Sequence, residues 1–331
     1  MCWRSVDFLL LLLNGDGPEA VPCLYDGWDM SLFLAIDAGG TKTSCVLADE
    51  TRVLGRAGTG SVKLMRVGEA EASARLRAML AEASLAAGVG LGEVLRTCIG
   101  LAGFTIEAVR EWAEREIGDV VGGELLLCGD EEIALDGAFK GGPGILVIAG
   151  TGSNFVGRAA DGTIYTAGGW GPALGDEGSG FWIGQEALRA GFWAKDRGVP
   201  TELLKIIGEF WGTGSLGEIV EKANERPSPD FAALAPLVAS CAEGGDELAA
   251  AVLERAGTEL AEQVALVALK MQESDGDDRI KVAYTGGVIA QIAPVRAAMV
   301  AALKKSAPKV KVMEEAADSL EGALWRARGG K

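Results

Sequence analysis

The stretch LFLAIDAGGTKTS (Leu32–Ser44) decides the fold class of this chain. Leu32–Ile36 is a continuous apolar run, which is typical of a buried β-strand. A polar turn, Asp37–Thr43, follows it, and Ser44–Ala48 predicts a second strand. After another short turn, Val53–Ala57 completes a meander of three strands whose first connection is rich in glycine and threonine.

The same pattern returns further along the chain. Gly144–Ala149 is again an apolar run, Gly150–Asn154 a turn of glycine, threonine and serine, and Phe155–Ala159 and Thr163–Ala167 are two further strands. The repetition predicts a duplicated architecture with two similar halves. Four more strands are expected to complete them, at Arg96–Leu101, Glu124–Cys128, Lys281–Tyr284 and Lys309–Met313.

Helical patterns lie between these strands. Glu69–Ala87 is rich in alanine, leucine and arginine and is followed by Gly88, as expected at a helix end. Further helices are expected at Thr105–Ile117 with Gly118 after it, from Ser215 toward Asn224, from near Phe231, over Asp246–Gln272 and over Ser319–Ala327. Strands that alternate with helices predict an α/β fold.

Composition narrows the function. The chain has 331 residues, 49% of them hydrophobic, and a formal net charge of −16. This length suffices for two ordinary domains with a sizeable core. Nucleic acid and anionic membranes bind through a positive field, so neither is expected as a partner. A small anionic nucleotide remains possible, because backbone N–H groups and one metal ion can hold it locally.

The chain contains no histidine, which excludes Ser-His-Asp and Cys-His catalysis and every metal site that needs histidine. A base in this protein is therefore expected to be a carboxylate. No two cysteines show CxxC spacing, which argues against a zinc ribbon, and their scatter is typical of a reduced, cytoplasmic protein. The six cysteines are Cys2, Cys23, Cys45, Cys98, Cys128 and Cys241.

Residues 1–30 contain the apolar run Phe8–Leu13, which is too short to span a bilayer. Asp7 precedes this run, which is atypical of a signal peptide. Met30 stands two residues before the first expected strand and resembles a natural start. We expect residues 1–30 to be a disordered extension or a mis-assigned start, and no membrane segment.

Two glycine-rich turns carry the first candidate chemistry. In Asp37–Thr43 the glycines permit close approach of a phosphate, and Asp37 stands where it can hold Mg²⁺ through water. The alternative is an ordinary hairpin turn with local Asp hydrogen bonds. Gly150–Asn154 has the same character at the matching place in the second half, so the two turns are expected to clamp a polyphosphate from both sides. Neither a Walker A motif nor a convincing GxGxxG turn is present.

The segment GGWGPALGDEGSG (Gly168–Gly180) carries a tryptophan and two carboxylates between glycines. The face of Trp170 suits a sugar ring, and Asp176 can accept bonds from adjacent hydroxyls. The alternatives are that Trp170 packs in the core of a surface loop, and that Asp176 and Glu177 cap the next helix.

Asp130 ends an apolar strand and precedes a helix, a position where α/β folds place ligands. It could orient a substrate hydroxyl and accept its proton, or it could simply be the helix N-cap. Tyr284–Val288 also lies between a strand and a helix, either against a nucleoside or as a plain turn.

Taken together, AIDAGGTKTS (Ala35–Ser44), AGTGSN (Ala149–Asn154) and Gly168–Gly180 resemble the motifs of the actin-like ATPase superfamily, which includes actin and the acetate and sugar kinases. Within it the chain is most similar to the BadF/BadG/BcrA/BcrD ATPase family, and there to the N-acetylglucosamine kinases. The resemblance runs from about Ser31 to Trp325, and Gly168–Gly180 is close to a signature.

This resemblance implies two RNase H-like domains with an active-site cleft between them. They would span residues 31–140 and 141–314, the second with a helical insertion at about 178–272. A C-terminal helix within 315–331 would pack back on the first domain.

The resemblance also implies a role for each motif residue. Asp37 lies near Mg²⁺ and Asp130 stands where the family has its catalytic base. ATP is held by Gly39, Gly40, Thr41, Lys42 and Thr43, by Gly150, Thr151, Gly152 and Ser153, and by Gly286 and Gly287. The sugar meets Asn154, Gly169, Trp170 and Asp176.

One stretch departs from the family pattern. The kinases place an Asn of a Ser-Xaa-Asn sequence against the sugar, whereas this chain has Ser61-Val62-Lys63, with Arg66 nearby. We hypothesise that Lys63 meets an acidic substituent of the substrate, such as the lactyl group of N-acetylmuramic acid.

The activity that the resemblance implies is ATP-dependent phosphorylation of an amino sugar or N-acetylated amino sugar, expected at the C6 hydroxyl and with N-acetylglucosamine as the first candidate. A homodimer is expected by analogy alone. Two alternatives are an ATPase that activates a partner, as the 2-hydroxyacyl-CoA dehydratase activators do, and a non-catalytic sensor of sugar or nucleotide.

Overall fold

The computed structural model describes residues 31–275 and 280–330, so the expectations for residues 1–30 fall outside the described chain. The strands of the first half are β1 (Leu32–Ala38), β2 (Lys42–Ala48), β3 (Val53–Gly60), β4 (Val94–Leu101) and β5 (Glu124–Gly129). Those of the second half are β6 (Gly144–Ala149), β7 (Ser153–Arg158), β8 (Ile164–Gly168), β9 (Lys281–Thr285) and β10 (Lys311–Val312).

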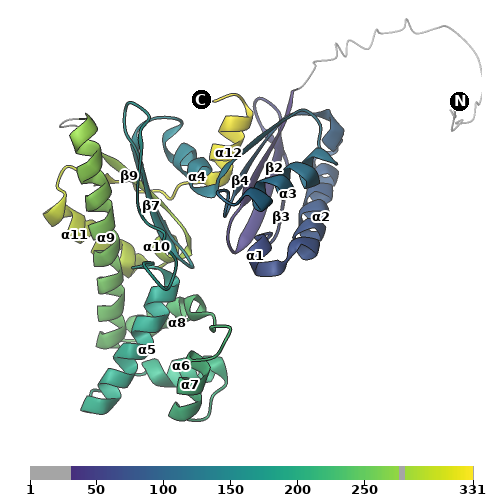
Figure 1. The fold of residues 1–331 in the computed structure, drawn as a ribbon. Coiled ribbons are helices and arrows are strands. Elements are labelled where there is room, and N and C mark those ends of the chain that lie inside the picture. Colours follow the sequence, from purple (N-terminus) through teal and green to yellow (C-terminus); the bar gives the residue numbers. More distant parts are fainter. Residues whose placement is uncertain (1–30, 276–279, 331) are drawn as a thin grey trace, which may run out of the picture. The chain divides into compact units, whose positions relative to one another are not determined.

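Within the described residues these strands form two five-stranded sheets of identical topology (Figure 1). The orders are β3-β2-β1-β4-β5 and β8-β7-β6-β9-β10. In each sheet the central strand pairs antiparallel with the strand after the glycine-rich turn and parallel with the first strand that follows the three-stranded meander. The predicted α/β fold and its internal repetition are confirmed.

The helices follow the predicted pattern in most places. In the first half they are α1 (Leu64–Val67), α2 (Glu69–Ala87), a 3₁₀ turn (Leu91–Glu93), α3 (Glu107–Gly118) and α4 (Asp130–Phe139). Then come α5 (Gly180–Arg197), α6 (Leu203–Trp211), α7 (Leu216–Ala223), a 3₁₀ turn (Phe231–Leu234), α8 (Ala235–Glu243) and α9 (Glu247–Asp275). The last are α10 (Gly287–Gln291), α11 (Ala293–Ser306) and α12 (Ser319–Ala327).

Three local expectations need correction. Gly118 is the last residue of α3 rather than the residue after the helix, because the backbone keeps helical dihedral angles through Asp119. The helix expected from Phe231 begins as a 3₁₀ turn that Asp230 caps. The last strand covers only Lys311–Val312, because pairing with β9 is confined to those two residues.

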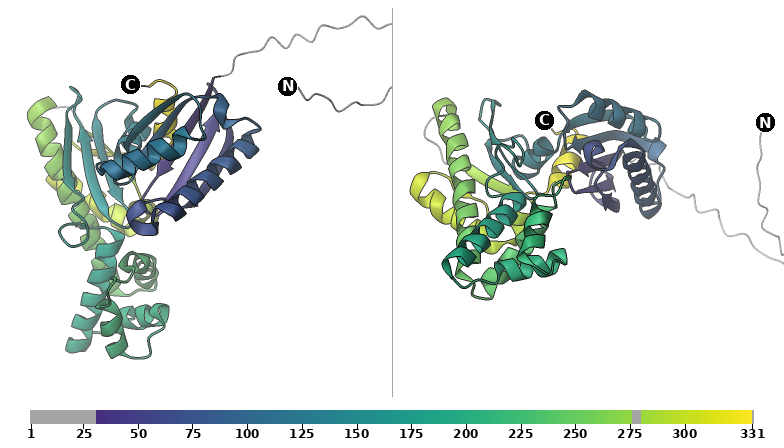
Figure 2. Two further views of the ribbon diagram at one scale, coloured as in Figure 1. Left: turned by 45° about the vertical axis from the view of Figure 1, so that its right-hand side comes forward. Right: turned by 60° about the horizontal axis from the view of Figure 1, so that its bottom comes forward.

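Each sheet has its own core. In the first half, α2 and α3 bury Leu76 and Trp112 against one face of the sheet. In the second half, α9 buries Val264 and Val267 with the residues of β6, and α5–α8 gather at the end where α9 begins (Figure 2).

Helix α4 is apolar on more than one side. Its Ile133 packs with β1 and β4 residues of the first sheet, whereas Ala134 and Leu135 pack with Leu146 and Val156 of the second. Apolar side chains of α4 thus pack against a different sheet on each of two sides. The start of α4 is thereby fixed relative to both sheets.

Helix α12 returns the chain to the first sheet, where its Leu324 shares a cluster with Phe33 of β1. It crosses α4 closely: a Cβ on Gly322 would lie 1.8 Å from the Ile133 carbonyl oxygen, so only glycine fits.

A buried ion-pair network reinforces the same helices. Asp136 of α4 is 1% exposed; Arg158 of β7 donates to its Oδ1 at 2.7 Å, and Arg326 of α12 donates to its Oδ2. One carboxylate therefore joins three elements that are far apart in sequence.

Asp136→Ala leaves these two guanidinium groups without their shared carboxylate. Loss of one partner from a buried pair costs about 3–5 kcal/mol, so we expect a loss of that size in the free energy of unfolding in urea. Lys205→Ala removes an exposed pair with Glu202 and is the control, with an expected cost below about 1 kcal/mol. Equal effects of the two substitutions would contradict the assigned role of Asp136.

Candidate active site

The two glycine-rich turns lie against each other. Thr41 follows β1 of the first sheet and Thr151 follows β6 of the second, yet their Oγ1 atoms are 3.3 Å apart. This contact joins residues 110 positions apart in the chain. The residues predicted to clamp a phosphate from two sides are thus brought together.

The glycines of these turns leave room for a ligand. A Cβ built on Gly40 or Gly287 would meet no atom within 4 Å, and one on Gly150 would meet only ordinary contacts with Gly286 and Gly287. Gly286 is different: its φ is +104°, and a Cβ would lie 2.4 Å from the Ala149 carbonyl oxygen. Gly286 therefore brings the start of α10 tightly against the end of β6, next to the second turn.

The second turn is fixed by the start of α5. Gly180 donates its backbone N–H to the Gly150 carbonyl at 2.8 Å, and Phe181 donates to the Thr151 carbonyl at 3.1 Å. Ser153 donates through Oγ to the Glu177 carbonyl at 2.9 Å. The turn is thereby held rigidly beside the N-terminus of a helix, an environment that favours anions.

Asp37 lies near the end of β1 and is partly buried. Burial raises the pKa of Asp37 to about 6, the charge of Lys42 lowers it in part, and the charge of Asp318 raises it. Over the ranges 31–275 and 280–330, no hydrogen bond reaches this carboxylate, so the alternative that it serves as a local turn residue gains no support. A partly buried carboxylate without a hydrogen-bonded partner suits a hydrated cation.

Thr43, at the base of the first turn, is buried, and its Oγ1 has no hydrogen-bond partner in the part of the chain that the structure describes. In the same part no group of three or more acidic or cysteine side chains is arranged to enclose a metal. Asp37 alone is consistent with Mg²⁺, which usually keeps several waters and is held by one or two carboxylates and by phosphates.

Asp130 is the first residue of α4 and not its N-cap. The N-cap is Gly129, whose N–H is bonded by Glu132 Oε1 at 3.1 Å, so the capping alternative for Asp130 is wrong. Burial raises the pKa of Asp130 to about 7, and a hydrogen bond and charge from Glu131 and the charge of Asp37 add to this. A carboxyl group that titrates near neutral pH and lies close to Asp37 has the properties of a general base.

Trp170 is 73% exposed, so the alternative that it packs in the core is wrong. Gly169 has a φ of +73°, and a Cβ there would lie 2.8 Å from Asn154 Oδ1, so these two predicted sugar residues are in contact.

Asp176 does not cap α5, because the N-cap is Ser179. Instead Asp176 Oδ1 accepts the Ser153 N–H at 3.3 Å, which places it on the second turn. Burial raises the pKa of Asp176, and the charge of Lys63 opposes this. Lys63 thus lies within electrostatic range of Asp176 although it belongs to the first half. Its side chain is exposed and, within the described residues, forms no ion pair.

The sequence interpretation missed Asp318 and Glu131. Asp318 is the N-cap of α12 and accepts the Leu320 N–H at 2.9 Å, and its place in the sequence signals only that capping role. Its proximity to Asp37 follows from the return of α12 to β1. Glu131 adjoins Asp130 in sequence, but their interaction depends on the backbone turn into α4.

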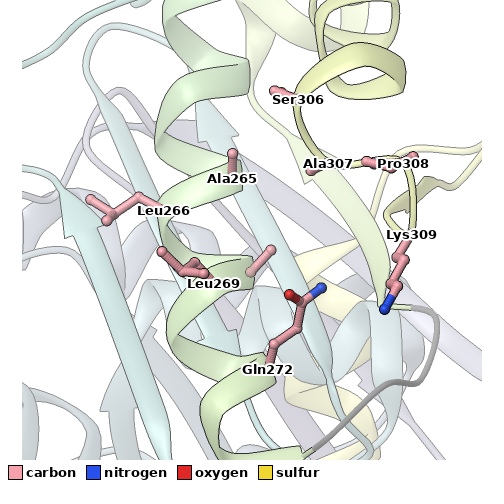
Figure 3. Close-up of a pocket in the computed structure, with 9 residues that line it drawn as sticks. Ala265, Leu266, Leu269, Gln272, Ser306, Ala307, Pro308 and Lys309 are labelled. Carbon is pink, nitrogen blue, oxygen red and sulfur yellow. The ribbon is translucent and has the colours of Figure 1, made fainter.

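One cavity of the described chain lies elsewhere. It has a volume of about 410 Å³ and lies between α9 and the segment after α11, where Leu266, Leu269, Gln272 and Pro308 line it (Figure 3). None of the predicted site residues contributes to it, so it is not the candidate site.

Among the described helices, none has the length and apolar character needed to cross a bilayer.

Comparison with known proteins agrees with this geometry. The chain is 31% identical to the N-acetylmuramic acid/N-acetylglucosamine kinase of Clostridium acetobutylicum, over 90% of this chain and 99% of that protein. It is 27% identical to the N-acetyl-D-glucosamine kinase of Dictyostelium discoideum, over 91% and 98%. A solved structure from Chromobacterium violaceum, assigned as an N-acetylglucosamine kinase, matches with a TM-score of 0.71 and 30% identity, over 90% of this chain and 99% of that one.

A family model for the BadF/BadG/BcrA/BcrD ATPases matches residues 34–324. This range contains both sheets, apart from the first two residues of β1, and every predicted site residue. The chain is therefore a sugar kinase that belongs to the BadF/BadG/BcrA/BcrD ATPase family.

Proposed function

We propose that this kinase transfers the γ-phosphoryl group of ATP to the C6 hydroxyl of an N-acetylated amino sugar, with N-acetylglucosamine as the first acceptor. The observation that supports this most is the 3.3 Å approach of Thr41 to Thr151, because it puts both glycine-rich turns at one place. Asp37 and Asp130 interact electrostatically with each other there.

The nucleotide would lie along the open glycines. Gly39–Thr43 and Gly150–Ser153 offer backbone N–H groups and hydroxyls to the phosphates, and Gly287 offers space for the nucleoside next to Gly286. Asp37 would hold Mg²⁺ through water, and the ion would neutralise charge on the transferred phosphoryl group.

Asp130 would orient the sugar hydroxyl and accept its proton. Its elevated pKa means that a proton taken from the hydroxyl is retained near neutral pH. The rest of the rate should come from positioning and charge stabilisation, because phosphoryl transfer requires little covalent participation from the protein.

The sugar would lie between Asp176 and Lys63. Asp176 and Asn154 can accept bonds from ring hydroxyls, and exposed Trp170 can cover the ring face. Lys63 approaches Asp176 from the other half. An ammonium group there suits a lactyl carboxylate on the C3 oxygen of N-acetylmuramic acid, which leaves the C6 hydroxyl free. The relative from C. acetobutylicum bears both sugars in its name.

The partner-activating alternative needs cysteines that can hold an iron–sulfur cluster across a dimer. The four cysteines that the structure describes, Cys45, Cys98, Cys128 and Cys241, are all buried. Inert buried thiols are poor candidates for a shared cluster.

A coupled assay of ADP release over N-acetyl sugars, amino sugars and plain hexoses tests the proposal. We expect strong release with N-acetylglucosamine and a 6-phosphate product by NMR. If none of the sugars in the panel causes ADP release, the sensor alternative is favoured. Phosphate on another hydroxyl would overturn the C6 assignment alone.

Asp130→Asn should bind nucleotide as the wild type does but lose turnover by ~10²-fold or more, the scale of general-base effects. Single-turnover kinetics separates the phosphoryl transfer step from nucleotide binding. Near-normal turnover would refute the role of Asp130.

The same variant should show a pH-dependent gain in stability. Because the pKa of Asp130 rises from 3.8 to about 7, its ionisation destabilises the folded state, so the wild type loses stability between these pH values. Relative to the wild type, Asp130→Asn should gain about 1–3 kcal/mol between pH 4 and pH 8. Denaturant unfolding at both pH values checks this, and a difference that does not vary with pH would contradict burial of the ionised group.

Lys63→Ala should lower kcat/KM for N-acetylmuramic acid by about 10- to 100-fold, the loss of one charge-assisted hydrogen bond. N-acetylglucosamine, which has no carboxylate, should change by less than about threefold on the same argument. Lys63→Arg keeps the charge and is the control. If Lys63→Ala leaves the ratio of kcat/KM for the two sugars unchanged, the proposed contact between Lys63 and the lactyl carboxylate is wrong.

A further inference from the structure

The carbonyl group of Gly40, in the first turn, accepts two hydrogen bonds from one neighbouring segment. Ser61 donates through Oγ at 2.9 Å and Arg66 through Nη1 at 3.3 Å. Both donors lie between the end of β3 and the end of α1, 21 and 26 residues beyond Gly40. The direction of this carbonyl is therefore set by the segment Ser61–Arg66.

The direction of a carbonyl fixes the direction of the next amide. In a trans peptide the C=O of one residue and the N–H of the following residue point in opposite directions. Since the Gly40 carbonyl points toward Ser61, the N–H of Thr41 points away from that segment. Thr41 is the residue that contacts Thr151, so this amide belongs to the junction of the two turns.

Ser61 also connects this peptide to Lys63. Its Oγ accepts the Lys63 backbone N–H at 3.1 Å while it donates to Gly40. The side chain is only 3% exposed, and Arg75 holds the Ser61 carbonyl through Nη1 at 3.0 Å. One buried hydroxyl thus links the residue proposed to meet the sugar with the turn proposed to meet the phosphates.

We propose that Ser61 is a positioning residue that couples sugar binding to the geometry of the phosphate-binding turn, an inference that rests on the proposed function. When a sugar holds Lys63, the Ser61 hydroxyl holds the Gly40 carbonyl, and the Thr41 amide stays aimed at the nucleotide. Without the hydroxyl, the Gly40–Thr41 peptide keeps only the longer bond from exposed Arg66. The turn then becomes less ordered, and transfer to the sugar competes less well with transfer to water.

Two measurements test this on the full chain. Calorimetry with Mg²⁺ and a non-hydrolysable ATP analogue, without sugar, should show a loss of affinity of about 5- to 10-fold in Ser61→Ala, the range for one buried hydrogen bond. In steady state, the KM for ATP should rise more than the KM for sugar, and the ratio of ADP released to sugar phosphate formed should increase. Arg66→Ala should shift both quantities in the same direction by less.

Ser84→Ala is a matched control. Ser84 donates through Oγ to the Val89 carbonyl at 2.6 Å at the end of α2, so this variant also loses a hydroxyl-to-carbonyl bond in the first half, outside the site. It should leave both readouts unchanged. Ser61→Thr keeps the hydroxyl and should restore the analogue affinity, which shows that a loss in Ser61→Ala is not simple misfolding.

The outcomes separate this inference from the proposed function. If no sugar is phosphorylated by the wild type, the proposed function fails, while the calorimetric comparison still measures the effect of Ser61 on the turn. If Ser61→Ala binds the analogue as Ser84→Ala does and keeps the wild-type ratio of ADP to sugar phosphate, the coupling role is overturned.

Discussion

The position of Asp130 depends on the burial of one short helix against two sheets. Because Ile133 packs on the first sheet and Ala134 and Leu135 on the second, α4 cannot move with one sheet without losing contacts with the other. The Asp136 carboxylate adds ion pairs to β7 and α12. The first residue of α4, which lies within electrostatic range of Asp37, is therefore positioned by a rigid element rather than by a loop.

The local architecture could be predicted from the sequence. Apolar runs indicate the central strands because such strands are buried on both faces, and the repeated strand–turn–strand pattern predicts two similar halves, which the two sheets of one topology confirm. The sequence also predicts that the two glycine-rich turns share one role, because they follow the matching strand in each half; their 3.3 Å approach at Thr41 and Thr151 is consistent with that prediction.

Other features could not be predicted, because they depend on contacts between distant segments. The capping role at α4 fell to Glu132 rather than Asp130 because the backbone begins the helix one residue earlier than the pattern suggested. The proximity of Asp318 to Asp37 needs the return of α12 onto β1, and the bond from Ser61 to Gly40 needs the exact end of β3. The hydrophobic periodicity of a single segment carries no information about contacts with a distant segment.

The carboxylates of the candidate site repel one another, so we expect a bound cation to stabilise the site. Asp37 lies within electrostatic range of both Asp130 and Asp318 in a chain with a net charge of −16, and burial raises the pKa values of Asp37 and Asp130. Like charges in a low dielectric repel strongly, so without a cation the ionised site is the less stable form. In the proposed mechanism, a hydrated Mg²⁺ held by Asp37 would offset that repulsion and favour the ionised form of Asp130. The ability of Asp130 to accept a proton would then depend on the bound phosphate donor and its metal ion.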